Sequence, residues 1–315
     1  MSRWYKGNLH SHTTNSDGML SPEQAIEAYR NRGYSFLCLS DHNVYTDYRN
    51  EFPREDFLIL PGVEASAVLV NDRGQPIRLH HMNGILGTQE MQETAKSGLF
   101  SHMEPVKEVI YHRSWQGKQA GEALARKLKE HGCIVTYNHP IWSRVEAKDF
   151  IDNPYIDLLE IYNYNTVNES GTGYDVTYWD LMLRRGRKIN ADAADDNHNG
   201  GLFDDAFGGF IMVKAESLTH DAIIRAILEG EYYSSSGPLI YCCEKTDGKI
   251  RIECSPVERI IIIVGGIVGA GVTFIAEDGK LISEAEYILT GEEQYVRVEC
   301  CDQRGRMAWT NPMYF

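Results

Sequence analysis

A unit of helix, glycine, strand and histidine recurs three times in this sequence and constrains its fold more than any other feature. The three copies are "SPEQAIEAYRNRG" with "SFLCLSDH", "GEALARKLKEHG" with "CIVTYNHP", and "DVTYWDLMLRRG" with "RKINADAADDNH". Ser21 fits a capping box, Asp175 fits an N-cap, and Gly33, Gly132 and Gly186 end the three helices. Helices that alternate with apolar strands indicate a parallel sheet, and a β/α barrel brings the C-terminal ends of its strands to one face. We therefore expect an α/β fold in which the histidines meet.

The other segments extend this pattern and then depart from it. Residues 56–64 and 157–163 are predicted strands that end at Glu64 and near Glu160, and "LTHDAIIRAILEG" is a predicted helix. Residues 88–119 lack clean periodicity, and we expect an excursion that helps to roof the site. After residue 238 short β-prone runs follow, with turns expected at Asp247-Gly248 and Asp278-Gly279. The predicted domains are a barrel over 1–238 and a small all-β domain over 239–315.

Composition excludes several classes of protein. A net charge of −14 argues against binding a nucleic-acid duplex, because affinity for phosphates comes from Lys and Arg. The run "IIIIVGGIVGAGVTFIA" is shorter than the ~20 residues of a membrane-spanning helix, and its glycines predict two strands around a turn. The N-terminus lacks the apolar run of a secretory signal, so we expect a cytoplasmic protein with reduced cysteines.

The strongest chemical signal is a pair of histidines one residue apart. On a strand, His10 and His12 face the same side and can bind one ion, and Asp196 and His198 repeat this spacing. The full predicted ligand set, nearly all at strand ends, is His10, His12, Asp17, His42, Glu64, His81, His139, Asp196 and His198. These ligands are too many for one ion, so we expect two or three divalent ions, with Mn, Fe and Zn all suited to imidazole and carboxylate donors. His80 is an alternative to His81.

In this order, "LHSHTTNSDG", "LSDH", "PGVE", "NHP" and "DDNH" resemble the motifs of the polymerase and histidinol phosphatase (PHP) superfamily, over roughly residues 7–236. The resemblance implies a distorted (β/α)7 barrel with a trinuclear metal site. It implies three ligand groups: His10, His12, Asp196 and Glu64; Glu64, His81 and His139; Asp17, His42 and His198.

Two short stretches of this sequence are also compared with members of the superfamily: the acidic pair before His198 and the closing segments of the chain. Many relatives have a single Asp before x-His where this chain has "ADDNH", so Asp195 and Asp196 are alternative ligands, and the Asp-x-His spacing favours Asp196. The segments "GRMAWTNPMYF" and "SSGP" are similar to the branch that includes carbaryl hydrolases.

The expected activity is hydrolysis of a small phosphorylated metabolite by a metal-activated hydroxide, because divalent ions lower the pKa of water and stabilise a displacement at phosphorus. Asp41 is the candidate for orienting a ligand or relaying a proton, and Arg113 and Arg144 are candidate phosphate clamps. Alternatives are a carbamate or amide hydrolase with the same centre, or a metal-stabilised binding module without catalysis. The aromatic candidates for stacking on a substrate are Trp115, Trp142 and Tyr164. The β domain is expected either to cap the barrel or to support a homodimer.

Overall fold

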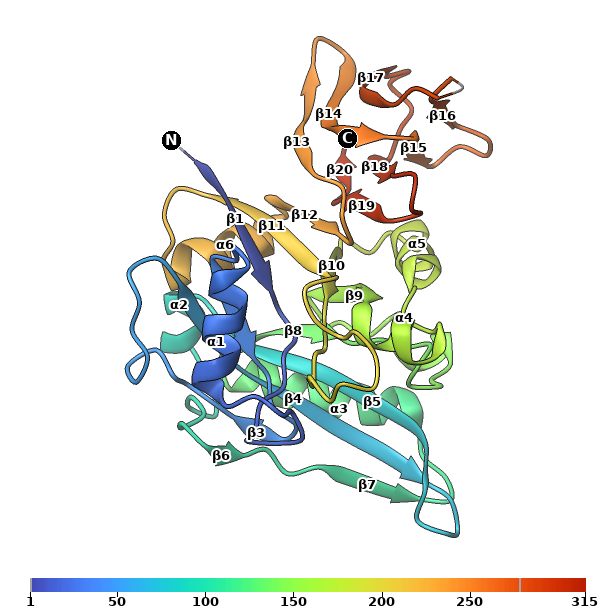
Figure 1. Ribbon diagram of the computed structural model, residues 1–315. Coiled ribbons are helices and arrows are strands. Elements are labelled where there is room, and N and C mark those ends of the chain that lie inside the picture. Colours follow the sequence, from blue (N-terminus) through green and yellow to red (C-terminus); the bar gives the residue numbers. More distant parts are fainter. Residues whose placement is uncertain (1, 278) are drawn as a thin grey trace.

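The computed structural model describes residues 2–277 and 279–315 and shows a mixed α/β fold with one large sheet and few helices (Figure 1). The sheet has 15 strands. In spatial order its first part consists of β10 (Asn190–Ala194), β9 (Leu158–Asn163), β8 (Cys133–Tyr137), β5 (Pro76–Leu86), β4 (Leu58–Val70), β2 (Phe36–Leu39) and β1 (Arg3–Asn8). It continues with β11 (Phe210–Ala215), β12 (Tyr232–Ser235), β19 (Met307–Thr310), β18 (Tyr295–Cys301), β15 (Arg259–Gly265) and β16 (Gly271–Ile275).

The first part of the sheet is mainly parallel. β1 is parallel to β2, β2 to β4, β8 to β9, and β9 to β10, whereas β5 is antiparallel to both of its neighbours. The chain just after β10 also pairs with the chain just after β1. The Asp196 N–H donates to the His10 carbonyl, and the His12 N–H donates to the Asn197 carbonyl, both at 3.0 Å. The two ends of this strand series therefore lie side by side, and their histidines meet.

The predicted helices are present, and further short ones accompany them. The helices are α1 (Pro22–Asn31), α2 (Gln89–Glu93), α3 (Gly117–Glu130), α4 (Tyr164–Ser170), α5 (Val176–Arg184), α6 (His220–Glu229) and the 3₁₀ turn η1 (Ala147–Asp149). The capping box at Ser21 is confirmed, with Gln24 as its partner. Asp175 lies at the N-cap position of α5, but its side chain accepts a hydrogen bond from the Ile141 N–H at 3.1 Å instead of capping the helix.

A regular alternation of strand and helix is not what the structure shows. β4 turns directly into β5, and no helix stands between them. The Asn71 side-chain oxygen accepts the N–H groups of Arg73 and Gln75, and Gly74 has φ of 75°, so the chain reverses within a few residues. This hairpin explains why β5 runs antiparallel in an otherwise parallel neighbourhood.

The excursion over 88–119 forms short elements, one of which joins the large sheet. After α2, β6 (Glu104–Pro105) pairs with β3 (Val44–Tyr45), and β7 (Val109–His112) runs parallel to β4. Pairing to these strands holds the excursion along the side of the sheet.

Apolar side chains from the helices and strands form the core. On α3, Leu124 and Leu128 share one face and belong to one buried cluster with Tyr137 of β8 and Trp179 of α5. The Trp179 ring N–H donates to the Ile189 carbonyl at 3.0 Å, so the largest buried side chain also has its polar atom satisfied.

The segment after residue 238 is all β, as predicted, and Figure 1 shows it gathered at one end of the molecule. Besides β15, β16, β18 and β19 it contains β13 (Ile240–Thr246), β14 (Lys249–Val257), β17 (Ile282–Ile288) and β20 (Met313–Tyr314). β15 and β16 pair around the glycine-rich turn, which confirms two strands there. Asp247 and Gly248 have φ of 51° and 75° and form the expected turn, while Asp278 lies outside the described residues.

Pairing of β12 with β19 carries the large sheet across residue 238, and the domain boundary there stays a prediction. Among the described residues, no helix has the length and apolar character needed to cross a membrane.

Candidate metal centre

The nine predicted ligands lie in one cluster where the two ends of the strand series meet. Four sets of side chains bring ligand atoms within 4.8 Å of one another. These sets are His10, His12, Glu64 and Asp196; His12, Asp17, His42 and His198; His42, Glu64 and His81; and His10, His139 and Glu160. The first set has the same members as the first predicted group, whereas the second gains His12, the third has His42 in place of His139, and the fourth brings in Glu160.

Glu64, on β4, lies at the centre of the cluster and is fully buried. Its Oε1 lies 3.0 Å from His81 Nδ1 and 3.3 Å from the Nε2 atoms of His10 and His139, and its Oε2 lies 2.8 Å from His42 Nδ1. Although burial opposes ionisation, the facing imidazoles of His81 and His10 hold the pKa of Glu64 well below its usual value. A carboxylate in this position can bridge two ions.

Nitrogen and oxygen atoms of several side chains lie close enough together to bind the same ion. His10 Nε2 and His12 Nε2 are 3.2 Å apart, and Asp196 Oδ1 lies 3.0 and 2.9 Å from them. Among the described residues, Glu64 Oε2, His12 Nδ1 and His81 Nδ1 are buried without a hydrogen bond of good geometry. Buried polar atoms without partners are costly, and a divalent cation would satisfy several of them at once. The residues present therefore fit divalent metal ions.

Three histidines have their Nδ1 atoms engaged by a neighbouring group, which leaves Nε2 directed toward the cluster. Nδ1 of His10 contacts Glu160 Oε1 at 2.9 Å, that of His139 contacts Ser143 Oγ at 3.1 Å, and that of His198 contacts the Asp196 carbonyl at 2.9 Å. Such contacts fix the orientation of metal-binding imidazoles.

Sequence reasoning missed the groups that hold these ligands in place. Glu160 was seen only as part of a strand end, although it accepts from the His139 N–H at 2.9 Å as well as contacting His10. Two asparagine amides add to this support: Asn138 donates to Glu64 at 2.8 Å, and Asn163 donates to Asp196 at 3.1 Å. The only signal for Glu160 and Asn163 was their position at the end of a predicted strand.

Two of the ligands stand in a backbone conformation that non-glycine residues rarely adopt. His139 has φ of 27° and Asp196 has φ of 55°. Such residues cost about 1–3 kcal/mol each and persist where surrounding contacts enforce them. At Asp196 the enforcing contact is the hydrogen bond from its N–H to the His10 carbonyl.

The structure places the two pairs of alternative ligands in different surroundings. Asp195 Oδ1 accepts the N–H groups of Gly208 and Gly209, and its Oδ2 accepts the Phe207 N–H and the Tyr29 hydroxyl, so it ties the following loop in place while Asp196 faces the cluster. His80 and His81, which are neighbours on β5, also differ in their surroundings, because successive side chains on a strand point to opposite faces.

His80 contacts the Tyr137 hydroxyl at 2.6 Å and the Gly117 carbonyl at 2.8 Å, away from the cluster. Its ring stacks on Trp115 at a centroid distance of 4.6 Å. His81, by contrast, faces Glu64.

The three residues predicted to act in catalysis do not line the cavity beside the cluster. Asp41 is buried and accepts hydrogen bonds from Thr13, Asn15 and Ser16 in the loop between His12 and Asp17. It positions that loop, and its hydrogen bonds within the described residues do not include the predicted one to a ligand imidazole.

The arginine predictions need correction. Arg113 is 80% exposed and pairs with Asp72 at 2.6 Å, beside the β4–β5 hairpin. Arg144 is exposed, in a turn with φ of 59°, and is absent from the cavity wall. Arg113 is paired with Asp72 and Arg144 does not line the cavity, so the structure gives no support to either side chain as a phosphate clamp at the cluster.

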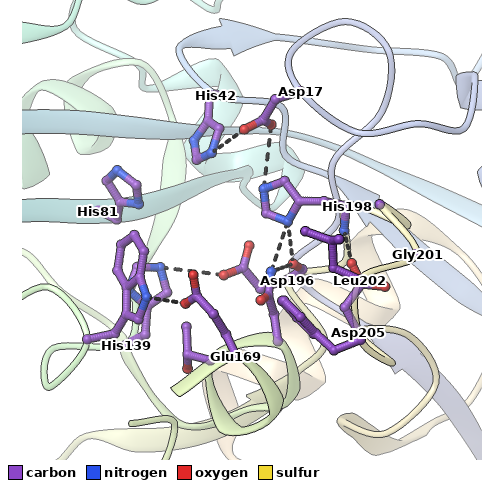
Figure 2. Close-up of a pocket in the computed structure, with 15 residues that line it drawn as sticks. Asp17, His42, His81, His139, Glu169, Asp196, His198, Gly201, Leu202 and Asp205 are labelled. Atoms are coloured by element: carbon purple, nitrogen blue, oxygen red, sulfur yellow. Dashed lines mark hydrogen bonds and ion pairs between the residues drawn. The ribbon is translucent and has the colours of Figure 1, made fainter. Parts of the chain in front are cut away.

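The cluster opens into a cavity of about 330 Å³ (Figure 2). Six predicted ligands line it together with Trp142, residues of α4, residues 200–203 and Asp205. No Lys or Arg of the described chain contributes to the wall, and none of the lining residues belongs to 88–119, so a roof formed by that segment stays a prediction. Of the aromatic candidates, only Trp142 lines the cavity; Trp115 stacks on His80, and the Tyr164 hydroxyl donates to Asp204.

Comparison with known proteins gives remote structural similarity. No family model and no curated protein matches the sequence. One similar solved structure is a two-domain protein containing a predicted PHP-like metal-dependent phosphoesterase from Bacteroides vulgatus ATCC 8482, with 11% identity over 99% of this chain and 96% of that chain and a TM-score of 0.47. Another is a proposed metal-dependent phosphoesterase from Bifidobacterium adolescentis ATCC 15703, with 15% identity over 70% of this chain and 95% of that chain and a TM-score of 0.41.

Proposed function

We propose that this chain is a metal-dependent hydrolase of the PHP superfamily that cleaves a phosphoester bond of a small metabolite. The observation that carries the proposal is the histidine and carboxylate cluster at the floor of a cavity of about 330 Å³. Structural metal sites are closed, whereas catalytic sites leave room for water and substrate, so this opening argues against a binding module without catalysis. The finer fold proposal is a distorted (β/α)7 barrel closed by the hydrogen bonds between the segments after β1 and β10.

The ligands proposed for two or three divalent ions are the nine predicted side chains, with Mn, Fe and Zn all compatible with these donors. Ions bound there would polarise the ester and make water nucleophilic near neutral pH. The protein's own part is orientation. Glu160, Ser143 and the Asp196 carbonyl hold the imidazoles of His10, His139 and His198 with Nε2 toward the cluster, and Asp41 holds the loop that carries Asp17.

A carbamate or amide hydrolase is the second candidate, and a specific observation favours it. Without a Lys or Arg on the described cavity wall, the site lacks the cationic clamp that an anionic substrate would use besides the metals. A neutral carbonyl substrate needs no such clamp. The similarity of the closing segments to the branch that includes carbaryl hydrolases points the same way.

Metal analysis combined with a substrate panel tests both candidates. The purified protein is assayed for bound metal and for hydrolysis of phosphomonoesters, cyclic phosphodiesters and aryl carbamates. We expect His139→Asn to lose metal and at least about 100-fold in activity, and His131→Asn, which changes a histidine at the end of α3, to keep both. Activity on carbamates alone would replace the first candidate by the second, and turnover without metal would refute both.

Other proposals concern the surroundings of the enzyme. We retain a cytoplasmic location and a small-molecule substrate as proposals, with homodimer formation or capping of the barrel as roles for residues 239–315. Truncation after Pro238 tests the last of these: a soluble active monomer supports a dimer module, and an insoluble remnant supports a cap.

A further inference from the structure

The wall of the cavity contains a tryptophan and a glutamate that the proposed metal site does not use. The Trp142 ring lies 5.0 Å from that of His139, at 83°, and 6.2 Å from that of His81. Its ring N–H donates to Glu169 Oε2 at 2.5 Å. The indole is therefore held beside two proposed ligands, where the group attached to the scissile bond would lie.

Outside the proposed ligand set, the charged side chains of the described wall are two carboxylates, with no Lys or Arg among them. Of its two carboxylates outside the ligand set, Asp205 accepts the N–H groups of His198 and Asn199 through one oxygen, each at 2.7 Å. Glu169 is exposed on α4, and among the described residues its only hydrogen bond is the one from Trp142. Figure 2 shows Glu169 directed into the space that His139 and Asp196 also face. Its other oxygen, Oε1, has no hydrogen-bond partner among the described residues and can meet a substrate.

Part of the remaining wall is apolar. Leu202, which is 91% exposed, and Phe203 line the cavity from the loop after Gly200 and Gly201. A flat organic group can pack on Trp142 and on these side chains, since ligand sites combine apolar contact with a few polar groups.

We propose that Trp142 and Glu169 select substrates whose leaving group is a flat organic amine with a positive charge. The reason is that an aromatic face and a carboxylate attract an ammonium group together, whereas a second phosphate or a carboxylate on the leaving group would meet Glu169 with no Lys or Arg on the described cavity wall to offset the repulsion. This inference rests on the proposed hydrolase function and narrows it to phosphoesters or carbamates of amine-bearing compounds. Glu169 is then a specificity-determining residue.

The test compares the binding of matched probes. Phenylphosphonates with a 4-aminomethyl, a 4-methyl or a 4-carboxyl group are titrated calorimetrically into the protein as purified. We expect the amine to bind about tenfold more tightly than the carboxylate, with the methyl compound between them. Glu169→Gln should reduce this ratio to near one, and Glu169→Lys should reverse it. Glu229→Gln, which removes an exposed carboxylate on α6, should leave it unchanged.

Trp142 has its own readout. Trp142→Leu should weaken the amine and the methyl probes alike by about fivefold or more, and Trp142→Phe should restore much of that loss, because the aromatic face contacts the ring in both. Equal binding of the amine and carboxylate probes, or a preference that survives Glu169→Gln, would overturn the proposal.

The corresponding aryl phosphates separate this inference from the proposed function. If the protein hydrolyses them without regard to charge, the hydrolase proposal stands and the selection by Glu169 is refuted. If it hydrolyses neither phosphates nor carbamates but keeps a preference for the amine probe that depends on Glu169, the hydrolase proposal fails. The proposed selection of amines by Glu169 is then supported.

Discussion

Replacing Glu160 by Gln tests the claim that this buried carboxylate orients a metal ligand. Glu160 is 1% exposed, and its Oε1 lies 2.9 Å from His10 Nδ1 while its Oε2 accepts the N–H of His139. Glutamine keeps the shape but removes the charge, and it turns one of the two oxygens into a donor facing either a ring nitrogen or an N–H.

The magnitude follows from the role assigned to Glu160. Loss of a carboxylate behind a metal-binding histidine costs about 10–100-fold in metal affinity, which corresponds to about 1.4–2.7 kcal/mol. We expect a loss in this range for Glu160→Gln, with the metal stoichiometry unchanged at saturation, because Glu160 is assigned to hold His10 instead of binding the ion itself.

The assay is a competitive titration with a metal chelator, with stoichiometry from elemental analysis and folding checked by circular dichroism. The matched control is Asp157→Asn, a carboxylate-to-amide change just before the same strand, where Asp157 pairs with Lys129 and lies outside the cluster. It should bind metal as the wild type does. A folded Glu160→Gln protein with undiminished affinity would refute the orienting role, and loss of one whole equivalent of metal at saturation would show that Glu160 is itself a ligand.

Three further predictions follow from the same contacts. His81→Asn should lower the metal content, whereas His80→Asn should keep it and destabilise the fold by about 1–3 kcal/mol, since the Tyr137 hydroxyl and the Gly117 carbonyl lose a buried partner. Elemental analysis and denaturant unfolding distinguish the two variants. Equal metal loss in both would contradict the assignment. Asp195→Asn should lower the free energy of unfolding by about 2–4 kcal/mol, because an amide NH₂ would face backbone N–H groups that now meet carboxylate oxygens. A change below about 1 kcal/mol, close to that of an ordinary surface substitution, would show that other contacts hold the 207–209 loop. Although burial opposes protonation, Glu64 raises the pKa of His42 to about 9 in the metal-free protein. Metal uptake at neutral pH must therefore displace a proton, and metal affinity should rise with pH up to about 9. Calorimetry in buffers of different ionisation enthalpy should detect the released proton, and pH-independent binding would refute this account.

Much of the fold was predictable because the signals are local. The capping box at Ser21 and the glycines at 33, 132 and 186, all with positive φ, mark helix ends through contacts that span only a few residues. The hairpin from β4 to β5 was missed although it too is local, because Asn71 and Gly74 were not recognised as a turn between two long strands.

The clustering of the proposed ligands was predictable for a related reason. The spacing of His10 and His12 puts both side chains on one face of an extended chain, and the histidines that follow strands were expected to share one end of the sheet. Spacing also favoured Asp196 over Asp195, and the structure places these neighbours in opposite roles.

The amino-acid sequence by itself determined where the chain turns, which residue types carry metal chemistry and which strand ends present them, because capping, backbone preference and side-chain alternation act within a few residues. Only the tertiary structure decided which groups stand behind the ligands and what lines the cavity. Glu160 reaches His10 across 150 positions of sequence, Arg113 pairs with the hairpin that contains Asp72, and Trp142 meets Glu169 only because α4 lies beside the turn after His139. Such partners depend on how distant strands are ordered in space, and no local pattern encodes that order.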